Sequence, residues 1–188
     1  MADLQLGPLG ESFFPNIAKP TEENRQIALE KLLLAEPATI ESELLKDYGT
    51  LAQKYLDRDV FKGTPITGKM LEKSAKETYE KTGKLIPLEL ALAQAQFESS
   101  MGREGRSPQT NPYNVGEFDN KTTMTFDKTE DGVDAYYKLM ANDYLNDKKP
   151  DELLKNFVNK NGHRYAKNPK YEAGLKTQIG YINRFLNK

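Results

Sequence analysis

The sequence predicts a mainly helical (α+β) domain with a small β-hairpin lobe, preceded by an extended and helical N-terminal arm. Three observations lead to this fold class. Apolar residues recur at helical spacing over most of the chain, whereas residues 105–126 are rich in Gly, Pro, Asn and Thr with short alternating pieces. The first 20 residues are interrupted by Gly and Pro without periodicity. With 37% hydrophobic residues, the 188-residue chain has enough apolar material for a single core.

Composition excludes several classes of protein. The chain has 27 Lys and Arg against 28 Asp and Glu, so it lacks the basic surplus of a nucleic-acid-binding protein. No apolar run approaches the roughly 20 residues that span a bilayer, and no membrane span is expected. The absence of cysteine and the single histidine, His163, argue against disulfides, thiol catalysis, a Ser-His-Asp triad and a zinc site. We therefore expect no metal and no cofactor, and chemistry that rests on carboxylates, tyrosines and amides.

The distribution of charge suggests two modules, residues 1–62 and residues 63–188. Residues 1–60 hold 6 basic and 11 acidic side chains, whereas residues 61–188 hold 21 and 17. The segment 61–65, with Gly63 and Pro65, resembles a linker, and we expect the boundary there. The arm is expected to contain an extended leader, a helix over 21–35 and a second helix from Thr39 whose apolar face is Ile40, Leu44, Tyr48, Leu51 and Tyr55.

The second module is expected to contain five helices and one hairpin. A buried helix is predicted from Pro87 to Gly102, because residues 90–96 are small or apolar on nearly every side. The hairpin would pair residues 115–118 with 123–126. The remaining helices are expected over residues 67–81, 129–144, 150–158 and 169–185.

Glu98 is the most informative single residue. It lies in the last turn of the predicted buried helix, where desolvation and the negative end of the helix dipole both favour a protonated carboxyl group. A carboxylic acid that is protonated near neutral pH is what a glycosidase needs to protonate a leaving oxygen. A solvated glutamate in a fraying turn would explain the position equally well.

Three motifs together resemble the bacterial and phage glucosaminidase family of peptidoglycan hydrolases, a branch of the lysozyme-like superfamily. Ala93-Gln-Ala-Gln-Phe-Glu-Ser-Ser-Met-Gly102 is similar to the catalytic-helix motif of that family. Asn111-Pro-Tyr-Asn-Val-Gly116 and Tyr165-Ala-Lys-Asn-Pro-Lys-Tyr171 resemble its second and third segments in the same order. The resemblance covers about residues 67–186 and implies a lysozyme-like fold for residues 63–188.

The resemblance also implies roles for individual residues. Glu98 would be the general acid on the glycosidic oxygen, and Tyr165 would lie beside the scissile bond. Glu117 or Asp119 of the hairpin, or the more distant Glu130, would supply a second carboxylate, unless the substrate's own N-acetyl group or a sugar hydroxyl takes that role. The sugar-binding residues would be Ser99, Tyr113, Asn114 and Tyr171.

The chain departs from the family pattern at two positions of the first motif. Met101 stands where tryptophan is usual, and Phe97 replaces a smaller residue. A Gly-Leu-Met-Gln segment typical of lytic transglycosylases is absent, which favours a glucosaminidase-like over a transglycosylase-like enzyme. The choice of glycosidic bond stays open, with an N-acetylglucosaminidase expected ahead of a muramidase. The alternative from a different class is a structural or adaptor protein of a virion. Its lysozyme-like domain would bind glycan or have only a structural role in the particle.

The sequence starts without the basic and apolar regions of a signal peptide. We therefore expect synthesis in a host cytoplasm and delivery to the cell wall in a phage particle, with residues 1–62 anchoring the protein to a tail or portal component. A soluble endolysin is the rival interpretation. The expected substrate in both cases is the peptidoglycan glycan strand.

Overall fold

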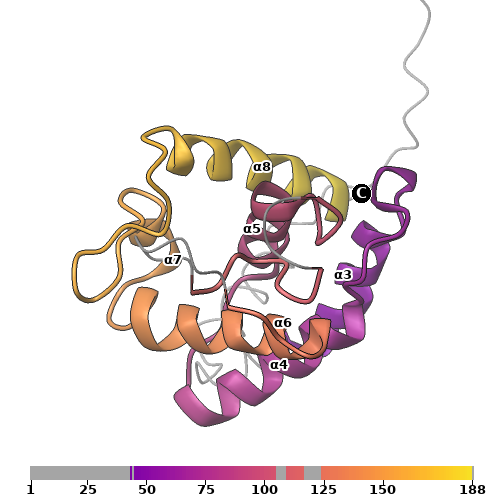
Figure 1. Cartoon of the computed structure of the whole chain (residues 1–188), viewed down its shortest axis with the longest axis horizontal. Coiled ribbons are helices and arrows are strands. Elements are labelled where there is room, and N and C mark those ends of the chain that lie inside the picture. The colour runs from indigo at the N-terminus through magenta and orange to yellow at the C-terminus, as the bar shows by residue number, and fades with distance from the viewer. Residues whose placement is uncertain (1–42, 44, 105–108, 117–123, 188) are drawn as a thin grey trace, which may run out of the picture. The chain divides into compact units, whose positions relative to one another are not determined.

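The computed structural model describes residues 43, 45–104, 109–116 and 124–187, and this part of the chain is mainly helical (Figure 1). The chain divides into two units, Met1–Ile40 and Glu41–Lys188, and the first lies outside the described residues. The expected extended leader and the helix over 21–35 therefore lie outside them too. Of the described helices, none combines the length and the apolar character needed to cross a bilayer.

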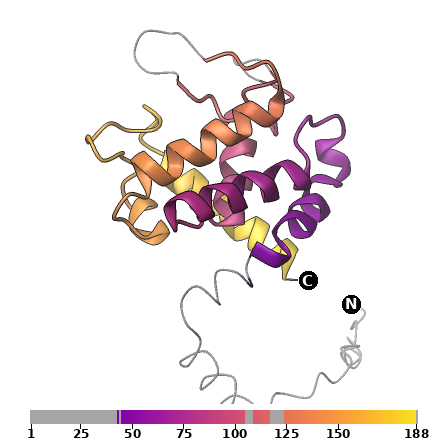
Figure 2. The same ribbon diagram turned by 90° about the horizontal axis from the view of Figure 1, so that it is seen from below.

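One central helix, α5, is surrounded by the others in the second unit (Figure 1). The C-terminal helix α8 packs along α5, and α4 packs against both α3 and α6. Figure 2 shows the end of α8 beside the first described residues, in agreement with the contact between α3 and α8. The helical segments are α3 (Tyr48–Leu56), η1 (Asp59–Phe61), α4 (Gly68–Thr82), α5 (Leu88–Ser99), α6 (Thr129–Leu139), η2 (Met140–Tyr144), α7 (Pro150–Leu153) and α8 (Tyr171–Leu186).

Helix α5 confirms the prediction of a buried helix after Pro87. Its side chains from Leu90 to Ala95 are all buried, so the helix has no solvent face along this stretch. Such a helix can only be stable in the middle of a core, because each of its sides must be covered by other elements. Its last turn carries Glu98 and therefore reaches the surface from the centre of the molecule.

Helix α3 precedes the expected boundary at residue 62 but packs in the same core as the helices that follow it. Tyr48, Ala52 and Tyr55 are buried in the core that α4, α5 and α8 also form. The tight packing of α3 on α4 needs two glycines, since a Cβ on Gly68 would lie 2.1 Å from the carbonyl oxygen of Gly49. The change in net charge near residue 60 does not coincide with the division of the chain into units, which lies between residues 40 and 41.

The segment between α6 and α8 differs from the expected helices. The helix expected over 129–144 is present, but its last five residues form a π-helix, Met140–Tyr144. Helix α7 ends at Leu153, well before the expected residue 158. Val158 instead forms an antiparallel bridge with Arg164, because the Asn159 side chain accepts the backbone N–H groups of Asn161 and His163 and closes a turn.

The expected hairpin falls mostly outside the described residues, at 117–123. Its described flanks, residues 115–116 and 124–126, do not form strands. They are joined by a backbone hydrogen bond from Met124 N–H to the Val115 carbonyl oxygen, at 3.3 Å. Gly116 makes this approach possible because it has φ +86° and a Cβ there would collide with the Met124 side chain.

Candidate active site around Glu98

The Glu98 side chain is held by hydrogen bonds on both carboxylate oxygens. Tyr171 Oη donates to Oε1 at 2.8 Å, and Asn114 Nδ2 donates to Oε2 at 2.8 Å. The Asn114 amide also donates to the main-chain oxygen of Glu98 at 3.1 Å, so it caps the end of α5. Each carboxylate oxygen has a second lone pair, and the group can carry a proton there while both hydrogen bonds persist.

Three residues near Glu98 have a positive φ, which residues other than glycine rarely adopt. Among the described residues, the non-glycine residues with positive φ are Ser100 (49°), Met101 (63°) and Asn114 (53°). Ser100 and Met101 follow Glu98 directly, and Asn114 contacts its carboxylate. A non-glycine residue in this region costs of order 1 kcal/mol, less for asparagine, and such residues cluster at functional sites.

The turn that carries Asn114 is fixed to the end of α5 by buried polar side chains. Asn111 is fully buried, and its side chain bonds the backbone of Val115 through both an N–H and a carbonyl group. The Ser99 hydroxyl donates to the Pro112 carbonyl oxygen at 2.5 Å and accepts from Gly102 N–H at 2.7 Å. Asn114 is therefore placed by α5 itself rather than by a free loop.

Tyr165 and Tyr171 form an aromatic wall beside the carboxylate. Their rings stack with centroids 5.9 Å apart and planes at 13°. Tyr165 Oη donates to the main-chain oxygen of Tyr113 at 2.7 Å, which ties this wall to the turn that carries Asn114. The ring of Phe97 meets Tyr171 edge-on at 5.4 Å and is 44% exposed.

Burial keeps the tyrosine hydroxyls around Glu98 in their protonated form. It raises the pKa of Tyr171 and of Tyr165 well above 10, and the negative charge of Glu98 raises both further. The same two causes act on Tyr136, and burial raises the pKa of Tyr144 on the π-helix. These groups are therefore neutral near pH 7 and are available as hydrogen-bond donors.

The structure brings Glu98, Asn114, Tyr165 and Tyr171 together but corrects the expected roles of Tyr113 and Ser99. The Tyr113 ring is fully buried and stacks on Tyr136 at 3.7 Å, so it cannot line a sugar site. Ser99 is buried and its hydroxyl is used within the protein, so it shapes the turn instead of binding a ligand. Both positions lie in motif segments, where composition does not separate a packing residue from a contact residue.

Of the three candidates for a second carboxylate, the structure describes only Glu130. Glu117 and Asp119 lie outside the described residues. Glu130 lies in the first turn of α6 and forms an ion pair with Lys73 of α4 at 3.5 Å. In the described part of the chain, no group of three or more His, Cys, Asp and Glu side chains is arranged to hold a metal ion.

Two residues of this site were missed by the sequence reasoning. Gln94 is fully buried one helical turn before Glu98, and its amide connects the hydroxyls of Tyr171 and Tyr136. The signal was present as the i, i+4 spacing of Gln94 and Glu98 on one helix face. The Tyr136 ring belongs to the core, whereas its hydroxyl belongs to the hydrogen bonds of the site.

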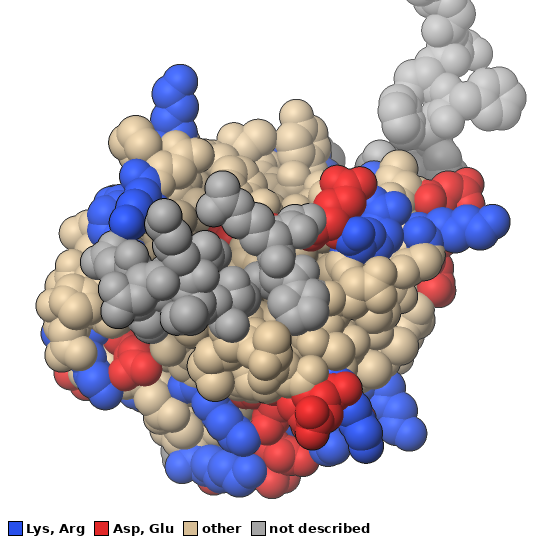
Figure 3. All heavy atoms as spheres, viewed as in Figure 1, with Lys and Arg blue, Asp and Glu red and all other residues tan. Residues whose placement is uncertain are grey.

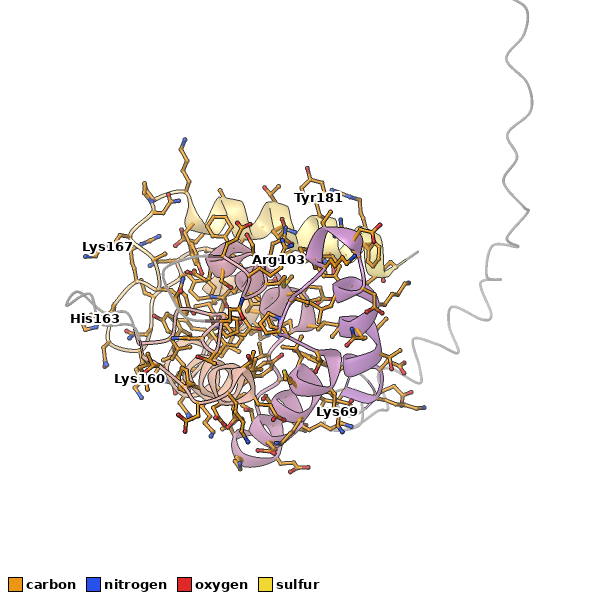
Figure 4. All side chains as sticks on the ribbon, turned by 45° about the vertical axis from the view of Figure 1, so that its right-hand side comes forward. Lys69, Arg103, Lys160, His163, Lys167 and Tyr181 are labelled. Carbon is orange, nitrogen blue, oxygen red and sulfur yellow. The ribbon has the colours of Figure 1, made fainter. Side chains whose placement is uncertain are left out.

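Charged side chains of both signs mix over the visible face of the molecule (Figure 3). On α4, Glu72 pairs with Lys76 and Glu77 pairs with Lys81, each at i, i+4 spacing. Lys160, His163 and Lys167 extend outward from the segment between α7 and α8 (Figure 4). His163 is exposed.

Comparisons with protein-family models, with curated proteins and with solved structures found no match to this chain.

Proposed function

We propose that this protein is a peptidoglycan hydrolase of the N-acetylglucosaminidase type, which cleaves a β-1,4 glycosidic bond of the glycan strand with Glu98 as general acid. The observation that carries the proposal is the hydrogen bonding of Glu98. Its two oxygens accept from Asn114 and Tyr171, and these donors come from the second and third of the motifs that resemble the glucosaminidase family.

The two hydrogen bonds to Glu98 support a role as general acid, because they hold its carboxyl group in one orientation relative to a bound substrate. Asn114 can only donate from its Nδ2 and Tyr171 is neutral, so the carboxyl plane is fixed between two donors. A fixed acid avoids the orientational cost that a free side chain would pay in the transition state. We propose that Tyr165, whose ring stacks on Tyr171, lines the same site.

The second half of the reaction is proposed to use Glu117, or Asp119 in its place, as base or nucleophile. Attack by the N-acetyl group of the substrate is the alternative that requires no second carboxylate. A carboxylate that acts as general base for water would invert the anomeric centre, whereas a carboxylate nucleophile and the N-acetyl group would both retain it. Anomer analysis of the first product would separate inversion from retention.

Digestion of purified peptidoglycan tests the proposal. Wild type should release fragments with N-acetylglucosamine reducing ends, identified by mass spectrometry. The substitution Glu98→Gln should lower the rate by roughly 10²–10⁴-fold, which is the usual contribution of a general acid. N-acetylmuramic acid ends would indicate a muramidase, and 1,6-anhydro ends would indicate a transglycosylase.

A matched control is the other glutamate of the same helix. Glu89 lies in the first turn of α5, at the opposite end from Glu98, so Glu89→Gln should leave the products and their rate unchanged. Absence of products from folded wild type, across walls of several chemotypes, would contradict the enzyme proposal. That result would favour the structural or adaptor role in a virion.

We also propose that the protein is carried in a phage particle, with the N-terminal part of residues 1–62 as its anchor to a tail or portal protein. The support is the acidic, separately grouped N-terminal unit Met1–Ile40. Particles assembled with a chain that lacks residues 1–40 should contain less of the protein. Equal incorporation of the shortened chain would contradict this role.

A further inference from the structure

A chain of hydrogen bonds runs from helix α6 through helix α5 to the carboxylate of Glu98. Tyr136 Oη donates to Gln94 Oε1 at 2.6 Å, and Gln94 Nε2 donates to Tyr171 Oη at 3.1 Å. Tyr171 Oη then donates to Glu98 Oε1 at 2.8 Å. Gln94 and Tyr136 are fully buried and Tyr171 is 1% exposed, so bulk water does not compete for these bonds.

The direction of each bond follows from the donors available. A tyrosine hydroxyl has one hydrogen, and Tyr136 uses it on Gln94 Oε1. The Gln94 amide must then present its N–H to Tyr171, whose hydroxyl accepts it and turns its own hydrogen toward Glu98. With the amide reversed, Gln94 Nε2 would face Tyr136 Oη and the Tyr136 hydrogen would lose Gln94 Oε1 as its acceptor, while Gln94 Oε1 would draw the Tyr171 hydrogen away from Glu98.

We propose that Gln94 is a positioning residue whose amide, oriented by Tyr136, directs the hydroxyl hydrogen of Tyr171 onto Glu98. The inference rests on the proposed function for its catalytic meaning, because Glu98 is the acid in that proposal. Gln94 itself does not contact Glu98 through a hydrogen bond that the structure shows. It acts through Tyr171, and α5 places it there because Gln94 lies one turn before Glu98 on the same face.

The surroundings of Glu98 make its titration a suitable measurement. Among the described residues, four tyrosines from the elements packed around Glu98 interact with its charge: Tyr136 of α6, Tyr144 of η2, Tyr165 before α8 and Tyr171 of α8. All of these hydroxyls stay neutral near pH 7, since burial raises the pKa of each. A change in the Glu98 titration near neutral or acidic pH is therefore not caused by ionisation of these tyrosines.

The substitution Gln94→Met removes the amide with little change in side-chain length. Without the N–H donor, the Tyr171 hydrogen is no longer directed to Glu98, and the carboxylate loses stabilisation. We expect the titration midpoint of Glu98, followed by NMR on 13C-labelled glutamate, to rise by about one pH unit. If the protein is the proposed enzyme, kcat should fall roughly tenfold with a smaller change in KM, and the alkaline limb of the pH–rate profile should move upward.

A second variant protects the test against a folding defect at position 94. Tyr136→Phe keeps the ring that stacks on Tyr113 and removes only the hydroxyl that fixes the Gln94 amide. It should move the Glu98 midpoint in the same direction by a smaller amount, because the amide becomes free to turn over.

Gln96 is the matched control for Gln94. It lies two residues later on α5, and its side-chain oxygen accepts from Tyr55 Oη and from Gln178 Nε2 on another side of the helix. Gln96→Met therefore removes a comparable tyrosine–glutamine bond that has no connection to Tyr171. It should leave the Glu98 midpoint and the pH–rate profile unchanged even where it lowers the melting temperature.

The outcomes separate this inference from the proposed function. An unmoved Glu98 midpoint in folded Gln94→Met, or an equal shift in Gln96→Met, overturns the positioning role whether or not the protein degrades peptidoglycan. A shift confined to Gln94→Met and Tyr136→Phe supports the positioning role. If that shift occurs in a protein without glycosidase activity, the hydrogen-bond chain is real and the enzyme proposal fails.

Discussion

At the scale of single residues, the buried tyrosines show that burial alone does not define a role. Tyr113 and Tyr136 stack on each other and are both fully buried. The Tyr136 hydroxyl donates to Gln94, whereas the Tyr113 hydroxyl is buried without a hydrogen-bond partner among the described residues. The Tyr136 hydroxyl thus contributes to the site around Glu98, whereas burial of the Tyr113 hydroxyl lowers the free energy of unfolding.

The two positions give opposite expectations for removal of the hydroxyl. Tyr113→Phe should leave the free energy of unfolding unchanged or raise it, since a buried unsatisfied polar group costs about 1–3 kcal/mol. Tyr136→Phe should lower it, because Gln94 Oε1 loses its donor. Urea unfolding monitored by circular dichroism measures both, and a clear loss of stability in Tyr113→Phe would show that its hydroxyl has a partner after all.

At the scale of elements, α8 holds the turn before it in place through Glu172. The Glu172 carboxylate accepts Phe157 N–H at 3.0 Å and forms an ion pair with Arg164 at 2.7 Å. Phe157 and Arg164 lie on the two sides of the turn 157–165, which leads into Tyr165. The position of Tyr165 next to Glu98 therefore depends on a carboxylate from the next helix.

This contact predicts how stability varies with pH. Burial opposes ionisation of Glu172, but the hydrogen bonds from Phe157 and Arg164 outweigh it and lower its pKa below 4.5. A depressed pKa in the folded state stabilises the fold above the pKa of the unfolded chain, and this stabilisation is lost as the pH falls through the folded value. The difference in unfolding free energy between wild type and Glu172→Gln should therefore be largest near pH 7 and shrink toward about pH 3.

Urea unfolding of both proteins across this range provides the measurement. The substitution Glu152→Gln is a suitable control. The Glu152 carboxylate accepts the backbone N–H of Lys149 at the exposed start of α7, and the structure shows no side-chain hydrogen bond from Glu152 to the described turn 157–165. A difference between wild type and Glu172→Gln that does not change with pH would contradict the proposed role of the charge.

At the scale of the whole molecule, the division of the chain decides which truncations are informative. The core of the second unit includes Tyr48, Ala52 and Tyr55 of α3, which pack with α4, α5 and α8. Tyr48 Oη also donates to the Ile86 carbonyl oxygen just before α5. A chain that starts at residue 61 therefore lacks part of its core, although charge and linker composition suggest a boundary there.

Two truncations test this division. Removal of residues 1–40 should leave the cooperative thermal transition of residues 41–188 in place, because the units divide between residues 40 and 41. Removal of residues 1–60 should lower the melting temperature strongly or prevent folding, since it exposes the α4 and α5 surfaces that α3 covers. Equal melting temperatures for the two shortened proteins would contradict the packing of α3 in the core.

Sequence periodicity correctly predicted helices with a strong apolar pattern. It was less successful where hydrogen bonds from polar side chains determine the backbone conformation. The helix expected over 67–81 is observed as Gly68–Thr82, with Thr67 as the N-cap through its hydroxyl and Gly83 in the left-handed conformation at the end. The helix expected over 150–158 ends at Leu153 instead. The Asn159 side chain bonds the backbone of Asn161 and His163 there, and a local side-chain contact of this kind leaves no periodic signal.

The sequence by itself determined that the chain is mainly helical, that α5 is buried and that Glu98 ends it, because these properties follow from local apolar spacing and from Pro and Gly positions. Tertiary structure alone decided which polar groups meet. Asn114 and Tyr171 reach Glu98 across 16 and 73 residues of sequence, and Gln94 reaches Tyr136 across 42. Contacts at such separations depend on how the helices pack, and the same packing separated Tyr113, a core ring, from the residues around Glu98.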